Sequence, residues 1–123
     1  MNKGRELDAL IAEKVMGLEV VRNKKGGWSI GPQDWFDVQG DMQLFNPLPS
    51  YSEDITYAFE VVEIVKNAGW YFHLDDYGGG GGQYMCVFDP DEDMLPTLTP
   101  ARGIADGAPH AICLAALKAV GYE

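Results

Sequence analysis

The sequence predicts an α+β protein folded as a single domain, residues 1–123. A chain of this length can bury a sizeable core, and its 46% hydrophobic and 23% charged residues are typical of globular proteins. Three segments repeat apolar residues at helical spacing, which indicates amphipathic helices. Two neighbouring segments alternate apolar and polar residues on either side of a glycine run, which indicates an antiparallel hairpin.

The three helices are predicted near residues 5–16, 53–68 and 108–120. Glycines that follow the first two, Gly17 and Gly69, are suited to end them, and Ser52 is the expected N-cap of the second. Its buried stripe is predicted to contain Ile55, Phe59, Val62 and Val65. The last helix, within Ala108–Gly121, is apolar around most of its circumference and is therefore expected to be the central core element. Its predicted buried stripe is Ile112, Cys113, Ala116, Leu117 and Val120.

The hairpin strands are predicted at Trp70–Asp76 and Gln83–Asp89, with Tyr71, His73 and Asp75 on one face of the first strand. A short strand is possible at Leu18–Arg22. Residues from about 23 to 50 form an irregular loop region, in which Trp35–Val38 and Met42–Phe45 could form a small ribbon. Residues 94–104 are expected to be extended, because prolines punctuate them.

Four blocks of the sequence carry a family resemblance: Leu7–Gly17, Tyr51–Glu63, Gly69–Leu74 and Ala108–Gly121. Together they resemble the phage ABA sandwich domain family, small proteins of phages and prophages. The resemblance implies a small α/β/α sandwich with a mainly antiparallel sheet and a location in the host cell cytoplasm. It supplies no catalytic residues. One departure is Gly107, where the family pattern leads us to expect Thr or Ser as the helix N-cap, so Asp106 is the candidate cap.

Acidity is the strongest compositional signal, because the formal net charge is −10. Between Gly26 and Ala101 the chain has thirteen acidic residues and one basic residue, Lys66. This charge would repel phosphate backbones, so direct nucleic-acid binding is not expected. It is explained either by solubility or by a surface for a basic host protein, such as an antiviral defence factor. The residues predicted to bind that partner are Asp75, Asp76, Tyr77, Tyr84, Asp91, Glu92 and Asp93.

Two other functions stay open. One is sequestration of a nucleotide-like signalling molecule, since glycine-rich backbones can form anion-binding concavities. Its predicted site is Gly78, Gly79, Gly80, Gly81, Gly82, Tyr71 and Arg102. The other is a small enzyme, although no catalytic motif is present and the favoured interpretation is non-catalytic. No metal-ligand spacing occurs around His73 or His110, so we expect no metal or cofactor. A homo-oligomer stays possible. We find neither a signal peptide nor a membrane-spanning apolar run.

Overall fold

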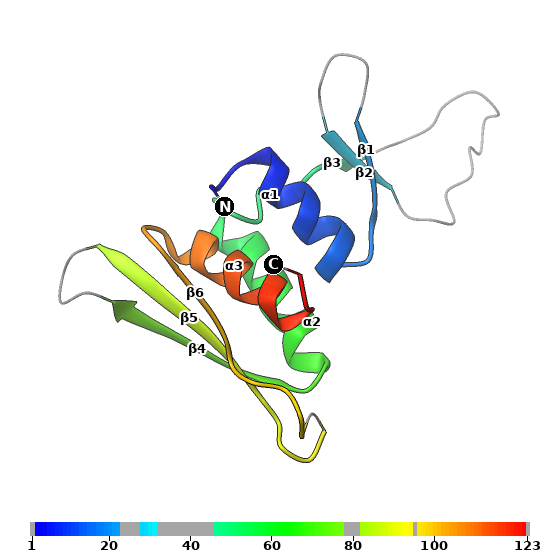
Figure 1. The fold of residues 1–123 in the computed structure, drawn as a ribbon. Helices are drawn as coiled ribbons and strands as arrows, with labels where there is room; N and C mark the ends of the chain where they lie inside the picture. Colours follow the sequence, from blue (N-terminus) through cyan, green and yellow to red (C-terminus); the bar gives the residue numbers. More distant parts are fainter. Residues whose placement is uncertain (1, 23–27, 32–45, 78–81, 95, 123) are drawn as a thin grey trace.

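A computed structural model describes residues 2–22, 28–31, 46–77, 82–94 and 96–122 of the chain (Figure 1). The first helix is α1 (Arg5–Leu10), continued directly by a π-helical turn, η1 (Ile11–Val15). The other helices are α2 (Ile55–Asn67) and α3 (Ala108–Ala119). The strands are β1 (Glu19–Arg22), β2 (Trp28–Gly31), β3 (Asn46–Pro47), β4 (Trp70–Tyr77), β5 (Gln83–Pro90) and β6 (Ala101–Ala105).

The strands form two antiparallel sheets of three strands each, in the orders β1-β2-β3 and β4-β5-β6. In the second sheet, β4 and β5 are the predicted hairpin, paired from Trp70 opposite Pro90 to Tyr77 opposite Gln83. β6 adds to the other side of β5, with Cys86 opposite Gly103. These three helices and the antiparallel sheet confirm the predicted α+β class.

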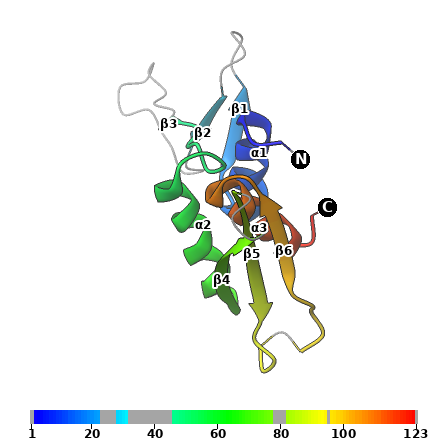
Figure 2. The same cartoon turned by 90° about the vertical axis from the view of Figure 1, so that its left-hand side faces the viewer.

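Helices α2 and α3 cover one face of the β4–β5–β6 sheet (Figures 1 and 2). Burial alternates along β6, where Ala101, Gly103 and Ala105 face the helices and Arg102 and Ile104 face away. The contact is closest at Gly103, because a Cβ atom there would lie 2.3 Å from the Ala111 carbonyl oxygen. All the described helices lie on this side of the sheet, so no described helix covers the opposite face.

The first helix packs on the other side of the α2–α3 layer, where η1 contacts both helices (Figure 1). Leu7, Ile11 and Ala12 are fully buried there. The small β1–β2–β3 sheet lies next to the N-terminal helix, because β1 contacts η1. The core therefore has α3 at its centre, as the sequence predicts. The structure further shows that α3 lies between the large sheet and the N-terminal helix. The fully or nearly buried residues of α3 are Ala111, Ile112, Cys113, Ala115, Ala116 and Leu117.

The helix termini confirm some of the predicted caps and correct others. Gly17, Gly69 and Gly121 have φ angles of 71°, 106° and 84°, so each ends its helix in a conformation that favours glycine. The prediction of Ser52 as N-cap of α2 was wrong, because the side chain of Asp54 accepts the hydrogen bond from the Thr56 N–H at 2.9 Å. Asp106 does not cap α3 either. Gly107 is the N-cap, without a side-chain hydrogen bond.

Three residues predicted to be buried are exposed, namely Ile55 and Phe59 of α2 and Val120 after α3. Helix α2 instead buries Ala58, Val61, Val62 and Val65, whose small side chains let it approach its neighbours closely. The ring of Phe59 lies beside this stripe and meets Phe72 of β4 edge to face, at 6.3 Å between centroids.

Strands β2 and β3 lie where the sequence predicted an irregular loop. The two segments proposed there as a ribbon, Trp35–Val38 and Met42–Phe45, lie outside the described residues. The short strand expected at Leu18–Arg22 is confirmed as β1, which pairs with β2. At the other end of the extended region, Ala101–Ala105 is β6.

Candidate functional site

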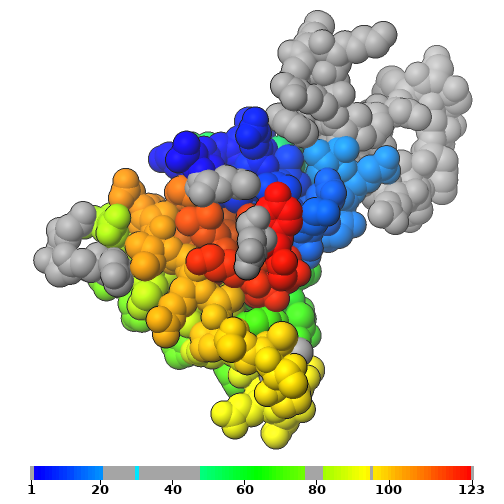
Figure 3. Space-filling model, in the orientation of Figure 1, coloured from blue at the N-terminus to red at the C-terminus, as the bar shows by residue number. Residues whose placement is uncertain are grey.

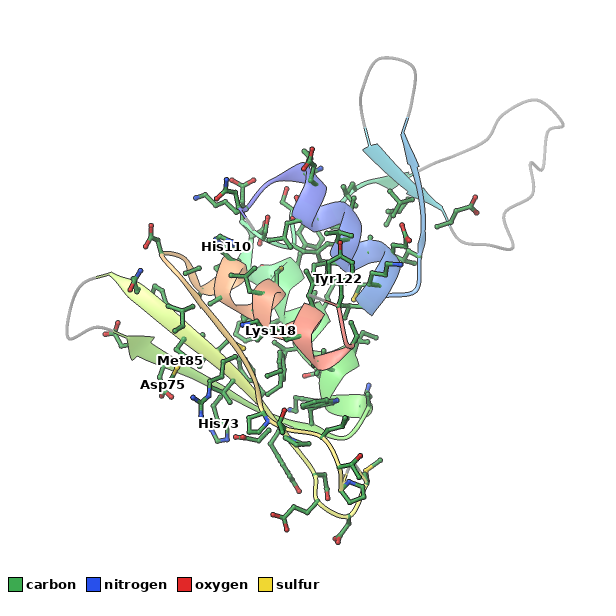
Figure 4. All side chains as sticks on the ribbon, viewed as in Figure 1. His73, Asp75, Met85, His110, Lys118 and Tyr122 are labelled. Atoms are coloured by element: carbon green, nitrogen blue, oxygen red, sulfur yellow. The ribbon has the colours of Figure 1, made fainter. Side chains whose placement is uncertain are left out.

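The face of the β4–β5–β6 sheet that points away from the helices is here called the outer face. The strand register places side chains of all three strands on it, and Figure 4 shows His73, Asp75 and Met85 on this side. The predicted alternation of Tyr71, His73 and Asp75 is therefore confirmed. The described side chains of the outer face are those of Tyr71, His73, Asp75, Gln83, Met85, Val87, Asp89, Arg102 and Ile104.

One end of the outer face carries a cluster of polar contacts around Tyr71. The Tyr71 hydroxyl donates a hydrogen bond to Asp91 Oδ2 at 3.2 Å, and the other oxygen of Asp91 accepts from the backbone N–H of Asp93 at 2.9 Å. The hydrogen bond to Asp91 and the negative charge of the Asp91 carboxylate raise the pKa of the Tyr71 hydroxyl. Next to Tyr71, the Nε2 atom of His73 lies 3.3 Å from Asp89 Oδ2.

These contacts fix the start of the segment between β5 and β6. Asp91 also donates its backbone N–H to the Gly69 carbonyl oxygen at 2.9 Å. An Asp side chain that accepts from the backbone two residues on forms a small turn, so Asp91 is occupied in shaping the chain. Glu92 and Asp93 are exposed, and their carboxylates have no hydrogen-bond or ion-pair partner among the described residues.

An open hollow of about 660 Å³ lies beside this cluster. The chain that surrounds it projects from the lower end of the molecule in Figure 3, where residues of the β5–β6 connection are yellow. The hollow is lined by four apolar residues and two acidic residues. Its lining residues are Asp89, Pro90, Glu92, Pro96, Leu98 and Pro100.

The residues predicted to bind a partner fall into two separate groups. Asp75, Asp76 and Tyr84 lie toward the glycine end of the hairpin, whereas Asp91–Asp93 follow its opposite end. With about 3.3 Å per strand residue, the two groups are about 20 Å apart. Asp75 is on the outer face, but Asp76 and its cross-strand neighbour Tyr84 are on the helix-facing side. Tyr77 is the last residue of β4, opposite Gln83.

The alternative ligand site is divided too. Gly78–Gly81 lie outside the described residues, and Gly82 is exposed with a φ of 78°. Tyr71 is at the far end of the hairpin from these glycines, opposite Asp89. Arg102 is opposite Val87 on the outer face. The structure therefore associates Tyr71 with the acidic segment after β5.

The two cysteine thiols are poorly suited to act as nucleophiles. Cys86 and Cys113 are fully buried free thiols. Burial raises the pKa of Cys86 to about 12 and that of Cys113 further, so both stay protonated at neutral pH. Within the described ranges, no group of three His, Cys, Asp or Glu side chains could hold a metal ion. None of the described helices is both long and apolar enough to cross a membrane.

The partner-binding residues predicted from the sequence include Asp91, Glu92 and Asp93 of this segment, but not Asp89 or the apolar residues of the hollow. The sequence feature that could have identified Asp89 is its position two residues after Val87, because alternate residues of a strand lie on the same face. The apolar wall formed by Pro96, Leu98 and Pro100 has no sequence signature, because it depends on how an irregular segment folds back beside β5.

A comparison with protein families shows to which family the chain belongs. The family model of the phage ABA sandwich domain matches residues 9–117. The chain belongs to the phage ABA sandwich domain family. The resemblance seen in four sequence blocks is thereby confirmed across nearly the whole chain. No curated protein matches the chain.

A solved structure shares the fold of this phage ABA sandwich protein. It is a phage protein from Bacillus cereus ATCC 14579, with a TM-score of 0.70 and 22% sequence identity. The alignment covers 100% of this chain and 94% of the other. At this identity the likeness concerns the fold alone.

Proposed function

We propose that this phage ABA sandwich protein is a non-catalytic accessory protein that binds a host protein with a basic surface. Antagonism of an antiviral defence factor in the host cytoplasm is the role that fits such binding. The observation that carries the proposal is the acidic segment at the end of the outer face. There, Glu92 and Asp93 are exposed beside Asp89 and Asp91, and no described lysine or arginine pairs with any of the four.

The outer face supplies the apolar part of such an interface. Tyr71 is 59% exposed although it is held in place by Asp91, and Ile104 is exposed on β6. Rigid aromatic residues that are already oriented lose little side-chain entropy on binding. A basic partner would be attracted by the carboxylates and then anchored by the aromatic and aliphatic groups.

The proposal is tested by affinity capture from host lysate with three forms of the full chain. The first is the wild type and the second is Glu92→Gln with Asp93→Asn. The third, Glu60→Gln with Glu63→Gln, removes the same charge from exposed positions of α2. We expect a host protein to be retained by the wild type and the α2 variant but lost from the Glu92/Asp93 variant. Identical sets of retained proteins for all three forms would contradict the proposal.

Sequestration of a nucleotide-like molecule is the competing function, and Arg102 is its only described cation on the outer face. A thermal-shift series with nucleotides separates the two, because a ligand that binds the native state raises Tm. A rise in Tm that Arg102→Gln abolishes would favour sequestration.

A further inference from the structure

The hollow beside β5 has a composition that suits one kind of side chain. Its walls are Pro90, Pro96, Pro100 and Leu98, and Leu98 is 46% exposed. Its charged lining residues are Asp89 and Glu92. An occupant must therefore offer apolar surface to the walls and positive charge to the two acids.

The charge of the hollow is not balanced within the described chain. Asp89 has only His73 as an ion-pair partner, and Glu92 has none among the described residues. A purely apolar occupant would remove these acidic side chains from water without supplying a cation, which is costly. A phosphate or carboxylate ligand would be repelled. A cation on an aliphatic stem meets both requirements.

Arginine fits this hollow better than lysine. Its planar guanidinium has five N–H donors and can bond two carboxylates at once, and it stacks on flat apolar surfaces such as proline rings. A volume of about 660 Å³ is larger than one side chain, so neighbouring residues of the same segment would enter as well.

We propose that the hollow lined by Asp89, Glu92, Leu98 and the three prolines binds an arginine side chain in an extended segment of the partner protein. This inference rests on the proposed function, since it specifies which group of a basic partner the acidic segment recognises. Tyr71 and His73 lie next to Asp89 on the outer face, so residues flanking the arginine would meet an aromatic and an imidazole ring.

The test is a titration of the ¹⁵N-labelled full chain with acetyl-Gly-Gly-Arg-Gly-Gly-amide, followed by amide chemical shifts. Two matched peptides carry lysine or citrulline in place of arginine, and citrulline has the shape of arginine without its charge. We expect shifts concentrated at residues 89–100, weaker binding of the lysine peptide and no binding of the citrulline peptide. Glu92→Gln should lower the affinity for the arginine peptide by roughly tenfold, because one charge-assisted hydrogen bond is lost.

Two further variants complete the test. Leu98→Ala should lower the affinity for the arginine peptide severalfold. Glu63→Gln, a matched loss of charge on α2, should leave that affinity unchanged. Retention of the native amide spectrum shows that each variant is folded. Shifts spread over all acidic surfaces, or equal affinity of wild type and Glu92→Gln, would overturn the arginine assignment. If a host protein still requires Glu92 and Asp93 for capture in that case, the proposed function stands and only this inference fails.

Discussion

The carboxylate oxygen Oδ1 of Asp8 accepts a hydrogen bond from the backbone N–H of Ser52 at 2.8 Å, and Asp8 is fully buried. Its other oxygen accepts from Arg5 at 2.5 Å, and the Gly4 N–H donates to Ser52 Oγ at 3.0 Å. Arg5 also donates to the Leu48 carbonyl oxygen at 2.8 Å. The network joins the first helix to the segment before α2, which is 44 residues away in sequence.

Replacing Asp8 by Ala should therefore lower the free energy of unfolding by about 2–3 kcal/mol, because the buried N–H of Ser52 loses its acceptor. Urea unfolding of the variant and the wild type measures this. The control is Glu6→Ala, at an exposed position of the same helix, which should change stability by no more than about 0.5 kcal/mol. Equal effects of the two changes would show that the Asp8 network contributes nothing.

The contact between β6 and α3 can be tested at Gly103. A methyl group there would lie 2.3 Å from the Ala111 carbonyl oxygen and 2.6 Å from the Ala115 nitrogen, and these backbone atoms cannot rotate away. Gly103→Ala should cost about 1–3 kcal/mol or more. Gly107→Ala is the matched control, since its Cβ would meet only Pro109 Cδ at 3.9 Å. A Gly103→Ala variant as stable as Gly107→Ala would contradict the close packing.

The central position of α3 can be tested at Leu117, which is 4% exposed. Leu117→Ala should lower the free energy of unfolding by about 2–5 kcal/mol, the range for buried leucines. Val120→Ala, at an exposed position after the same helix, should have a much smaller effect. Thermal melts of both variants would reveal a surface location for α3 if their Tm values were the same.

Buried acids with raised pKa values predict a loss of stability at high pH. Burial raises the pKa of Cys86 from 9.0 to about 12, and that of Tyr51 from 10.0 to about 12. The unfolded state then loses its protons first, so the contribution to stability is complete below pH 9 and declines as pH rises toward 12. Tm should fall across this window, and Cys86→Ala should reduce the slope. An unchanged slope would mean that the Cys86 thiol ionises equally in both states.

The sequence was most informative where residues repeat with a period. The helices and the hairpin follow from apolar spacing, and the positive-φ glycines mark their ends. Ser52 was wrongly predicted as an N-cap because its hydroxyl oxygen accepts a hydrogen bond from the Gly4 N–H instead. Gly4 is 48 residues away, so no local pattern indicates this contact. Phe59 was misplaced because its smaller neighbour Ala58 is buried instead, and Ile55 was misplaced because the first turn of α2, residues 55–57, is exposed.

The site was only partly predictable for a similar reason. Alternation correctly placed Tyr71, His73 and Asp75 on one face, and composition drew attention to Asp91–Asp93. Grouping these acids with Asp76 and Tyr84 treated neighbours in sequence as neighbours in space, whereas the hairpin separates them. The hydrogen bond between Tyr71 and Asp91 joins residues 20 apart, and it could be recognised only from the fold.

The central claim is that Glu92 and Asp93 bind a basic host protein, and association kinetics with the captured partner test it most directly. Rates are compared for the wild type, the Glu92→Gln/Asp93→Asn variant and the Glu60→Gln/Glu63→Gln control as salt is raised. Because salt screens exposed charges over a Debye length of about 8 Å at physiological ionic strength, the wild-type rate should fall steeply. The Glu92/Asp93 variant should associate more slowly at low salt and depend less on salt, while the control follows the wild type. Equal rates for all three proteins at every salt concentration would show that this acidity serves only solubility.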